Sequence, residues 1–175
     1  LKVYYCASRA DEPLLIQSNS LKCLKLKGIK SMQFSKLFSC PQLEELYMDD
    51  CPSLTMEHFP KLPCVQEITL VSCTELIQSD SHVESILNAA PNLSSLVIEY
   101  IPKLTRLVPK VQHMKLRRMK ISRCKALKVV DLSKWNASTV PCLNQILLQH
   151  LQLDLLKYPS SKKIITTENT VSTAR

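Results

Sequence analysis

Apolar residues recur along this chain in groups of three, and the groups follow one another at a spacing of 22 to 28 residues. Each group has an apolar first residue and two further apolar residues three and five places later. Successive side chains of a strand point to opposite faces, so this spacing predicts a short strand that buries one face. The complete groups begin at Leu21, Leu43, Val65, Leu93, Leu116 and Leu143, and Leu1 with Val3 forms a truncated seventh.

Other positions repeat together with the strands. Cysteine recurs eight residues after the first position, an apolar residue follows three residues later, and proline often stands two residues before the first position. The cysteines are Cys51, Cys73 and Cys124, with Cys6 in the truncated group. The apolar residues are Met32, Leu54, Leu76, Leu104 and Leu127, and the prolines are Pro41, Pro63, Pro91 and Pro141.

A period in the twenties with an L-x-x-L-x-L core is typical of leucine-rich repeats, whose units each contribute one strand and cannot bury their apolar face alone. The sequence therefore predicts an α/β fold, a leucine-rich repeat solenoid that forms a fragment of a curved horseshoe. We expect a parallel sheet of about seven strands on the concave side, with loops and short helices on the convex side. A hydrophobic content of 45 % is sufficient for one continuous core.

The two ends of the chain differ. We expect residues 1–154 to form the repeats, truncated on the N-terminal side because the chain begins inside a repeat, and residues 155–175 to form a C-terminal cap and polar tail. Asp154 breaks the pattern, and the stretch 160–175 is rich in Ser, Thr, Lys and Asn, as in a mobile tail. Alternatively, Ile164 and Ile165 within this stretch could pair as an edge strand.

The longest spacing contains an insert, Ser81–Ala90, that reads as a short helix. Ser81 is expected at the N-cap, with Glu84 as its partner in a capping box. We also expect a single turn over Phe34–Phe38, and we expect the lone tryptophan, Trp135, to pack over the core rather than to bind a ligand.

Residues for catalysis or cofactor binding are nearly absent. Gly28 is the one glycine, so a glycine-rich phosphate loop cannot be built. The four histidines are isolated, and no H-E-x-x-H or C-x-x-C motif occurs. We therefore expect no enzyme activity, no cofactor and no metal site, and the lack of a long apolar run argues against a membrane span.

The eight cysteines could form disulfides, but their repeated position favours a buried column of free thiols. Reduced thiols imply a cytoplasmic protein, with the nucleus also possible. The sequons at Asn92 and Asn136 favour secretion instead, although such triplets also arise by chance.

Charge is divided between two consecutive blocks. Residues 44–99 carry ten acidic residues against Lys61, a net charge of −9, and residues 103–134 carry eleven basic residues against Asp131, a net charge of +10. Because a solenoid converts sequence order into position along its axis, we expect adjacent acidic and basic patches. The alternative is that both blocks are ordinary solvated surface.

Strand alternation also predicts which side chains point into the concave surface, and Cys23 is among them. A shallow charged surface suits a protein partner better than a small apolar ligand. We expect the partner to contact Lys25, Lys27, Glu45, Tyr47, Asp49, Glu67, Arg118 and Lys120.

The phrases CPQLEELYMDDCPSL at Cys40–Leu54 and ITLVSCTEL at Ile68–Leu76 follow the pattern P-x-L-x-x-L-x-L-x-x-C-x-x-L. Over residues 1–154 the chain resembles the leucine-rich repeat region of plant intracellular immune receptors, which have a nucleotide-binding switch domain upstream. The resemblance implies a sensor module that binds a pathogen effector or host protein and holds that nucleotide-binding domain inactive.

Two other functions remain open. Plant F-box proteins carry similar cysteine-containing repeats, so the chain could be the substrate-binding part of a ubiquitin ligase adaptor. Seven basic residues between Lys115 and Lys128 could contact nucleic-acid phosphates, although the neighbouring acidic block would repel the same polymer.

Overall fold

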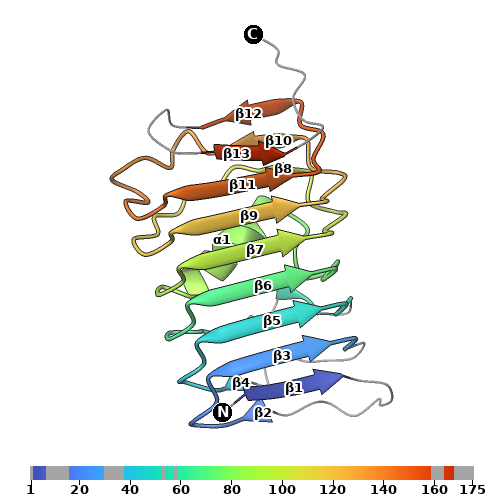
Figure 1. Cartoon of the computed structure of the whole chain (residues 1–175), viewed down its shortest axis with the longest axis vertical. Coiled ribbons are helices and arrows are strands. Elements are labelled where there is room, and N and C mark those ends of the chain that lie inside the picture. The colour runs from blue at the N-terminus through green and yellow to red at the C-terminus, as the bar shows by residue number, and fades with distance from the viewer. Residues whose placement is uncertain are drawn as a thin grey trace.

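A computed structural model describes residues 2–6, 16–29, 38–52, 54–56, 59–158 and 164–167 of the chain. These residues form a solenoid of parallel strands in which each coil adds one strand to a main sheet (Figure 1). The order of the main sheet is β1-β3-β5-β6-β7-β9-β11-β13. Its strands are β1 Lys2–Cys6, β3 Cys23–Lys27, β5 Glu45–Asp49, β6 Glu67–Val71, β7 Ser95–Glu99, β9 Arg118–Ser122, β11 Gln145–Gln149 and β13 Ile164–Thr167.

Two small parallel sheets and one helix complete the described part of the chain. The second sheet has the order β12-β10-β8, and the third pairs β2 with β4. Their strands are β8 Arg106–Leu107, β10 Val129–Asp131 and β12 Leu155–Lys157, then β2 Ile16–Gln17 and β4 Phe38–Ser39. Helix α1, Asp80–Ala89, lies behind the main sheet in the view of Figure 1.

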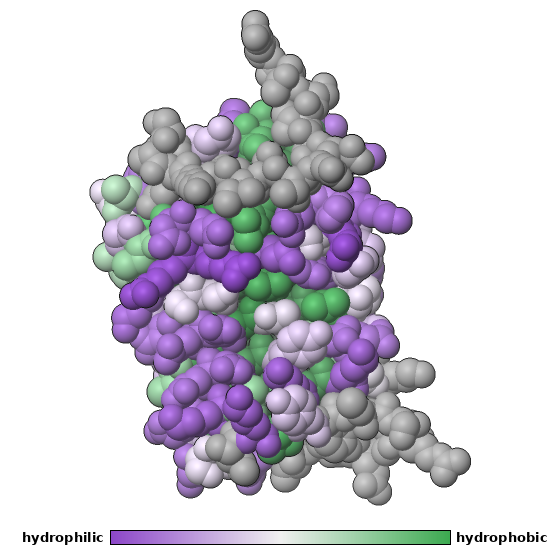
Figure 2. Space-filling view, in the orientation of Figure 1, coloured by the Kyte–Doolittle hydropathy of each residue, from purple (hydrophilic) through white to green (hydrophobic). Residues whose placement is uncertain are grey.

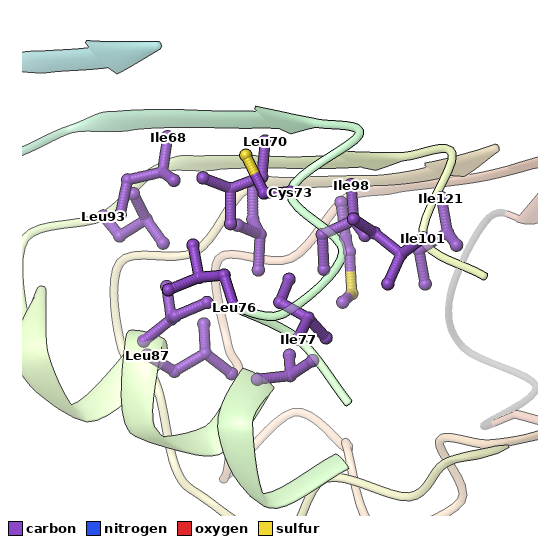
Figure 3. Close-up of a cluster of buried hydrophobic side chains, with 14 of the residues drawn as sticks. Ile68, Leu70, Cys73, Leu76, Ile77, Leu87, Leu93, Ile98, Ile101 and Ile121 are labelled. Carbon is purple, nitrogen blue, oxygen red and sulfur yellow. The ribbon is translucent and has the colours of Figure 1, made fainter. Parts of the chain in front are cut away.

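The register of the main sheet places equivalent residues of successive coils side by side. Leu46 pairs with Leu24 on one side and with Ile68 on the other. The two inward positions of each strand thereby form continuous apolar columns, which pack against the connecting segments and α1 (Figure 3). The predicted inward residues are all buried: Leu24, Leu26, Leu46, Ile68, Leu70, Leu96, Ile98, Ile121 and Ile146.

Tight turns lead into the strands. The N–H of Leu43 donates to the carbonyl of Cys40 at 3.1 Å, and the N–H of Leu93 donates to the carbonyl of Ala90 at 3.0 Å. The proline that precedes each of these leucines by two residues stands at the second position of the turn, where its fixed φ is favourable and no N–H is needed. This confirms the predicted bend before the strand.

Backbone hydrogen bonds tie each coil to the next at the start of the strands. The carbonyl of Glu44 accepts from the N–H groups of Gln66 and Glu67, and the carbonyl of Gln66 accepts from those of Ser94 and Ser95, at 2.8 to 3.1 Å. One carbonyl therefore accepts two hydrogen bonds from the following coil, so that backbone hydrogen bonding between coils begins just before the strands.

The strands end in a repeated left-handed residue, which adopts a φ of 52 to 68°. These residues are Gly28, Asp50, Ser72, Tyr100, Arg123 and His150. In the first five, the N–H donates to the carbonyl of the last strand residue in the next coil, at 2.9 to 3.1 Å. A left-handed φ is costly for residues with a Cβ, and here it recurs because it turns the chain back towards the core.

The predicted helix exists, but its cap is not the predicted one. Helix α1 begins at Asp80, so its N-cap is Ser79, two residues before the predicted Ser81, and Ser79 makes no side-chain capping bond. The capping box is also wrong, because Glu84 Oε1 accepts from the backbone N–H of Lys110 at 2.6 Å. Glu84 therefore links the helix to a later coil and does not close its own first turn.

The C-terminal segment 164–167 is a strand and not part of a mobile tail. It is β13, which pairs in parallel with β11 through Ile146 and Ile164 at the end of the main sheet. The alternative interpretation of Ile164 and Ile165 as an edge strand is therefore the one confirmed. The sheet has eight strands where about seven were expected.

Trp135 is buried in the core, as predicted, and its indole N–H has no hydrogen-bond partner. Several other expectations concern residues outside the described ranges. They are Leu1, Met32, the side chain of Cys6, and the turn over Phe34–Phe38 except for Phe38, which is in β4.

Candidate functional site

The outer face of the main sheet, defined as the side turned away from the core, carries three columns of side chains. The first column contains Cys23, Glu45, Glu67, Ser95, Arg118 and Gln145. The middle column contains Tyr4, Lys25, Tyr47, Thr69, Val97, Lys120 and Leu147, and the third contains Lys27, Asp49, Val71, Glu99, Ser122 and Gln149. All eight residues expected to bind a partner lie on this face. Figure 2 shows apolar surface near its middle, bordered by hydrophilic side chains.

A stack of aromatic rings and a cation lies near the N-terminal end of the middle column. The Lys25 ammonium is 5.3 Å from the centre of the Tyr4 ring and 5.8 Å from the centre of the Tyr47 ring. Such distances allow cation–π attraction, and the lysine fixes the two rings relative to each other. The Tyr4 side chain is 64 % exposed, and burial raises the pKa of the Tyr47 phenol above its ordinary value.

Three of the expected binding residues are already in ion pairs within the sheet. Lys27 pairs with Asp49 at 2.9 Å, across β3 and β5. Lys120 pairs with Glu99 at 2.5 Å, across β9 and β7, and both side chains of this pair are largely shielded from water. These three residues hold their neighbours in place and offer less charge to a partner than the sequence suggested.

Glu45, Glu67 and Arg118 are the expected binding residues of the first column. Glu45 and Glu67 are exposed neighbours in register, and no ion pair within the described chain neutralises either carboxylate. Arg118 is also exposed, between Ser95 and Gln145. Two adjacent carboxylates repel each other, so this column carries a small acidic area and, two strands further, a single cation.

The basic block does not form one patch. Residues 103–134 run through β8, β9 and β10, so they pass once around the cross-section of the solenoid. Arg106 lies on the second sheet, Lys120 on the outer face, Lys115 where the strand begins, and Lys125 beyond its other end. The block is a basic belt around one coil, beside the acidic coils, and its charges are spread over several faces of the solenoid.

Ion pairs connect the basic belt to the acidic coils beside it. They are Lys103 with Glu75 at 2.6 Å, Arg106 with Asp80 at 3.6 Å, and Lys120 with Glu99. Opposite charges thus meet at the boundary between the blocks. The two more exposed pairs contribute little to stability, and the shielded Lys120–Glu99 pair contributes more.

The cysteines of the repeated slot are buried, as predicted. Cys51, Cys73 and Cys124 have no exposed surface, and the Cys124 thiol donates to the carbonyl of Ser122 at 3.4 Å. Burial raises the pKa of the Cys124 thiol to about 11. A hydrogen bond with the Cys51 thiol, and then burial, raise the pKa of Cys73. All seven cysteines that the structure describes are free.

Cys23 lies on the outer face, as strand alternation predicts, but this position does not expose its thiol. Although it is on the outer face, Cys23 is only 2 % exposed, because the strands on both sides cover it. Burial raises the pKa of its thiol, and a hydrogen bond with Glu45 raises it further. The exposed thiol is Cys142, which stands in the turn before β11.

Sequence reasoning missed a groove along the edge of the main sheet at which the strands begin. Its volume is about 660 Å³. One side is lined by the residues that precede the first position of each coil: Gln42, Cys64, Asn92, Lys115 and Cys142. The other side is lined by the residues that follow it: Glu44, Gln66, Ser94 and Arg117. Aligning the repeats would have revealed both polar columns, which flank the buried leucine of each coil.

The geometry defines a parallel-sheet repeat solenoid with a broad outer face and a polar groove at one edge. No protein-family model matches the chain, and no curated protein or solved structure matches it either. None of the helices described is long and apolar enough to cross a membrane. Within the described ranges, no three His, Cys, Asp or Glu side chains form a group that could hold a metal ion.

Proposed function

We propose that the chain is a leucine-rich repeat module that recognises a protein partner through its outer face. The repeat pattern with its cysteine slot supports the repeat class, and the resemblance to plant intracellular immune receptors suggests the role. In such a receptor the partner is a pathogen effector or a host protein, and the module restrains an upstream nucleotide-binding domain in the cytoplasm.

The observation that carries this proposal is the Tyr4, Lys25 and Tyr47 stack on an open sheet face. Binding energy at protein interfaces concentrates in tyrosine, tryptophan and arginine side chains that are surrounded by weaker contacts. Here an apolar and aromatic middle is bordered by charged residues, which is the usual anatomy of a protein interface.

The charged residues of the face have two roles in this proposal. Glu45, Glu67 and Arg118 contact the partner directly, because no ion pair among the residues that the structure describes neutralises them. Lys27, Asp49 and Lys120 hold the sheet surface in shape through their ion pairs and contact the partner at its rim. Reversing Lys120 would place a carboxylate beside Glu99 and disturb the sheet, so Arg118 is the better probe of binding.

The test identifies the partner by the face it touches. A photo-crosslinking amino acid replaces Tyr47 in one variant of the chain and Ser85, on the exposed side of α1, in a second variant. We expect one partner to be crosslinked from position 47 and not from position 85. Equal labelling from both positions would argue against the outer face as the binding surface.

The affinity for that partner is then measured by surface plasmon resonance. Tyr47→Ala should weaken binding by about 30-fold, which corresponds to 2 kcal/mol. Tyr158→Ala is the matched control, because this tyrosine is exposed but lies off the outer face. Arg118→Glu should act mainly on the association rate. Unchanged affinity of the folded Tyr47→Ala and Arg118→Glu proteins would refute the proposal.

A further inference from the structure

The edge groove has a charge gradient along its length. At one end Glu44 is neutralised by Lys22, whose ammonium lies 2.7 Å from the carboxylate. The middle is lined by uncharged amide and hydroxyl side chains, such as Gln66 and Ser94. At the other end are Lys115 and Arg117, and no carboxylate in the described part of the chain pairs with either cation. The groove is therefore positive at one end only.

Lys115 is held in a fixed position by a neutral partner. Its ammonium donates to Asn92 Oδ1 at 2.5 Å, and Asn92 Nδ2 donates to the carbonyl of Pro63 at 2.6 Å. An amide oxygen orients the ammonium without neutralising it. Lys120 is different, because a carboxylate already compensates its charge. The groove thus presents a preorganised cation, which lowers the entropy cost of binding an anion.

The dimensions of the groove suit an extended peptide. It crosses five coils, and with about 4.8 Å between adjacent strands its length is roughly 19 Å. An extended chain rises about 3.3 Å per residue, so about six residues fill this length. Exposed amides such as Gln42 and Gln66 can donate to and accept from the main chain of such a peptide.

We propose that this edge groove is a second binding site, separate from the outer face, for an extended peptide segment with adjacent acidic residues. The acidic side chains contact Lys115 and Arg117, and the preceding residues lie over the amide-lined middle. The partner class follows from charge complementarity, since both charges left unpaired by carboxylates in the described part of the groove, Lys115 and Arg117, are positive.

A nucleic acid is the competing occupant, and the basic belt distinguishes the two. A polyanion would follow the belt around the coil and would also use basic residues outside the groove, such as Lys125 and Lys134. A peptide in the groove depends on Lys115 and Arg117 alone. The two pairs of residues therefore give matched variants with the same change in net charge.

The binding test uses a fluorescein-labelled Ser-Ala-Gln-Ser-Asp-Asp peptide, a control peptide that ends in Asn-Asn, and an oligothymidylate, each followed by fluorescence anisotropy. We expect the acidic peptide to bind more tightly than the neutral one, and salt to weaken its binding. Lys115→Ala/Arg117→Ala should reduce its affinity at least about tenfold, a loss of about 1.4 kcal/mol. Lys125→Ala/Lys134→Ala should change it less than about twofold, since these sites are outside the groove.

A second measurement locates the peptide through the thiol in the groove. Bound acidic peptide should slow the alkylation of Cys142 at least about fivefold at saturation, because the peptide covers the exposed sulfur. The neutral peptide should not slow it. Mass spectrometry of the labelled protein gives the rates, and it reports on binding even if one of the variants folds poorly.

Equal binding of the acidic and neutral peptides, or no protection of Cys142, would overturn the groove proposal. Equal losses of peptide affinity in the two double variants would also overturn it and would favour a general polyanion site. Tighter binding of the oligothymidylate than of the acidic peptide would have the same two consequences. Tyr47→Ala should leave peptide binding unchanged. The groove proposal and the proposed outer-face function can therefore fail independently.

Discussion

The two ion pairs Lys120–Glu99 and Lys22–Glu44 each join neighbouring coils and have the same chemistry but different surroundings. In the first pair the side chains are 25 % and 15 % exposed, and in the second they are 60 % and 39 % exposed. Replacing each lysine by Met and each glutamate by Gln keeps the shape of the side chain and removes its charge. Each pair then gives a complete double-mutant cycle.

The expected coupling energies follow from this difference in exposure. Pairs exposed to water usually contribute about 0.2 to 1 kcal/mol, and we expect that range for Lys22–Glu44. Breaking a buried pair costs about 3 to 5 kcal/mol, because one charge loses its partner while it stays desolvated. Lys120–Glu99 is only partly buried, so we expect a coupling energy of about 1 to 3 kcal/mol, which is smaller than for a fully buried pair. The Glu99→Gln variant should be less stable than the double variant, in which no charge remains uncompensated.

Urea unfolding followed by circular dichroism gives the stabilities of the native protein, the four single variants and the two double variants. In 1 M salt the Debye length is about 3 Å, so the Lys22–Glu44 coupling should vanish while most of the Lys120–Glu99 coupling remains. Equal couplings for the two pairs in low salt would refute the reasoning. Equal couplings would mean that water reaches the Lys120–Glu99 pair freely and that Lys120 is available to bind a partner.

Two further predictions concern single residues. Gly28→Ala should destabilise the fold by about 1 to 2 kcal/mol, and Ser72→Gly should leave it unchanged or stabilise it by up to about 1 kcal/mol, because both residues have a left-handed φ that disfavours a Cβ. Urea unfolding measures both, and an Ala variant as stable as the native protein would contradict the argument. The raised pKa of Cys124 means that the folded state favours the neutral thiol, so its contribution is complete below pH 9 and is lost as the pH rises to about 11. Between pH 9 and about pH 11, the free energy of unfolding should therefore fall less in Cys124→Ala than in the native protein, by up to about 2 to 3 kcal/mol. Parallel pH profiles of stability for the two proteins would rule this out.

The strands and the core were predictable because both depend on a short local period. Residues such as Leu46 and Leu96 occupy equivalent positions in successive coils, and a solenoid places equivalent positions in contact. The outward positions of Tyr47 and Lys25 follow from the same alternation. Predicting the strands, the core and these outward positions requires no knowledge of side-chain contacts between coils.

Features that depend on contacts between coils were not predicted. The burial of Cys23 comes from neighbouring strands, and the diagonal pair of Lys120 and Glu99 joins different columns of adjacent strands. The left-handed turns had no sequence signal beyond Gly28, because other residues such as Tyr100 occupy the same conformation. The groove was missed because alternation within a strand says nothing about the residues just outside it.

The division of charge between coils has a consequence for the molecule as a whole. Residues 44–99 carry a net charge of −9 and residues 103–134 a net charge of +10, and the structure arranges them in succession along the solenoid axis. The two blocks therefore form an electric dipole that is directed along the solenoid axis. In low salt, where fields extend over tens of ångströms, two copies attract most strongly when the basic belt of one faces the acidic coils of the other. Physiological salt shortens the range of this attraction to about 8 Å, so it orients a partner only in the final approach.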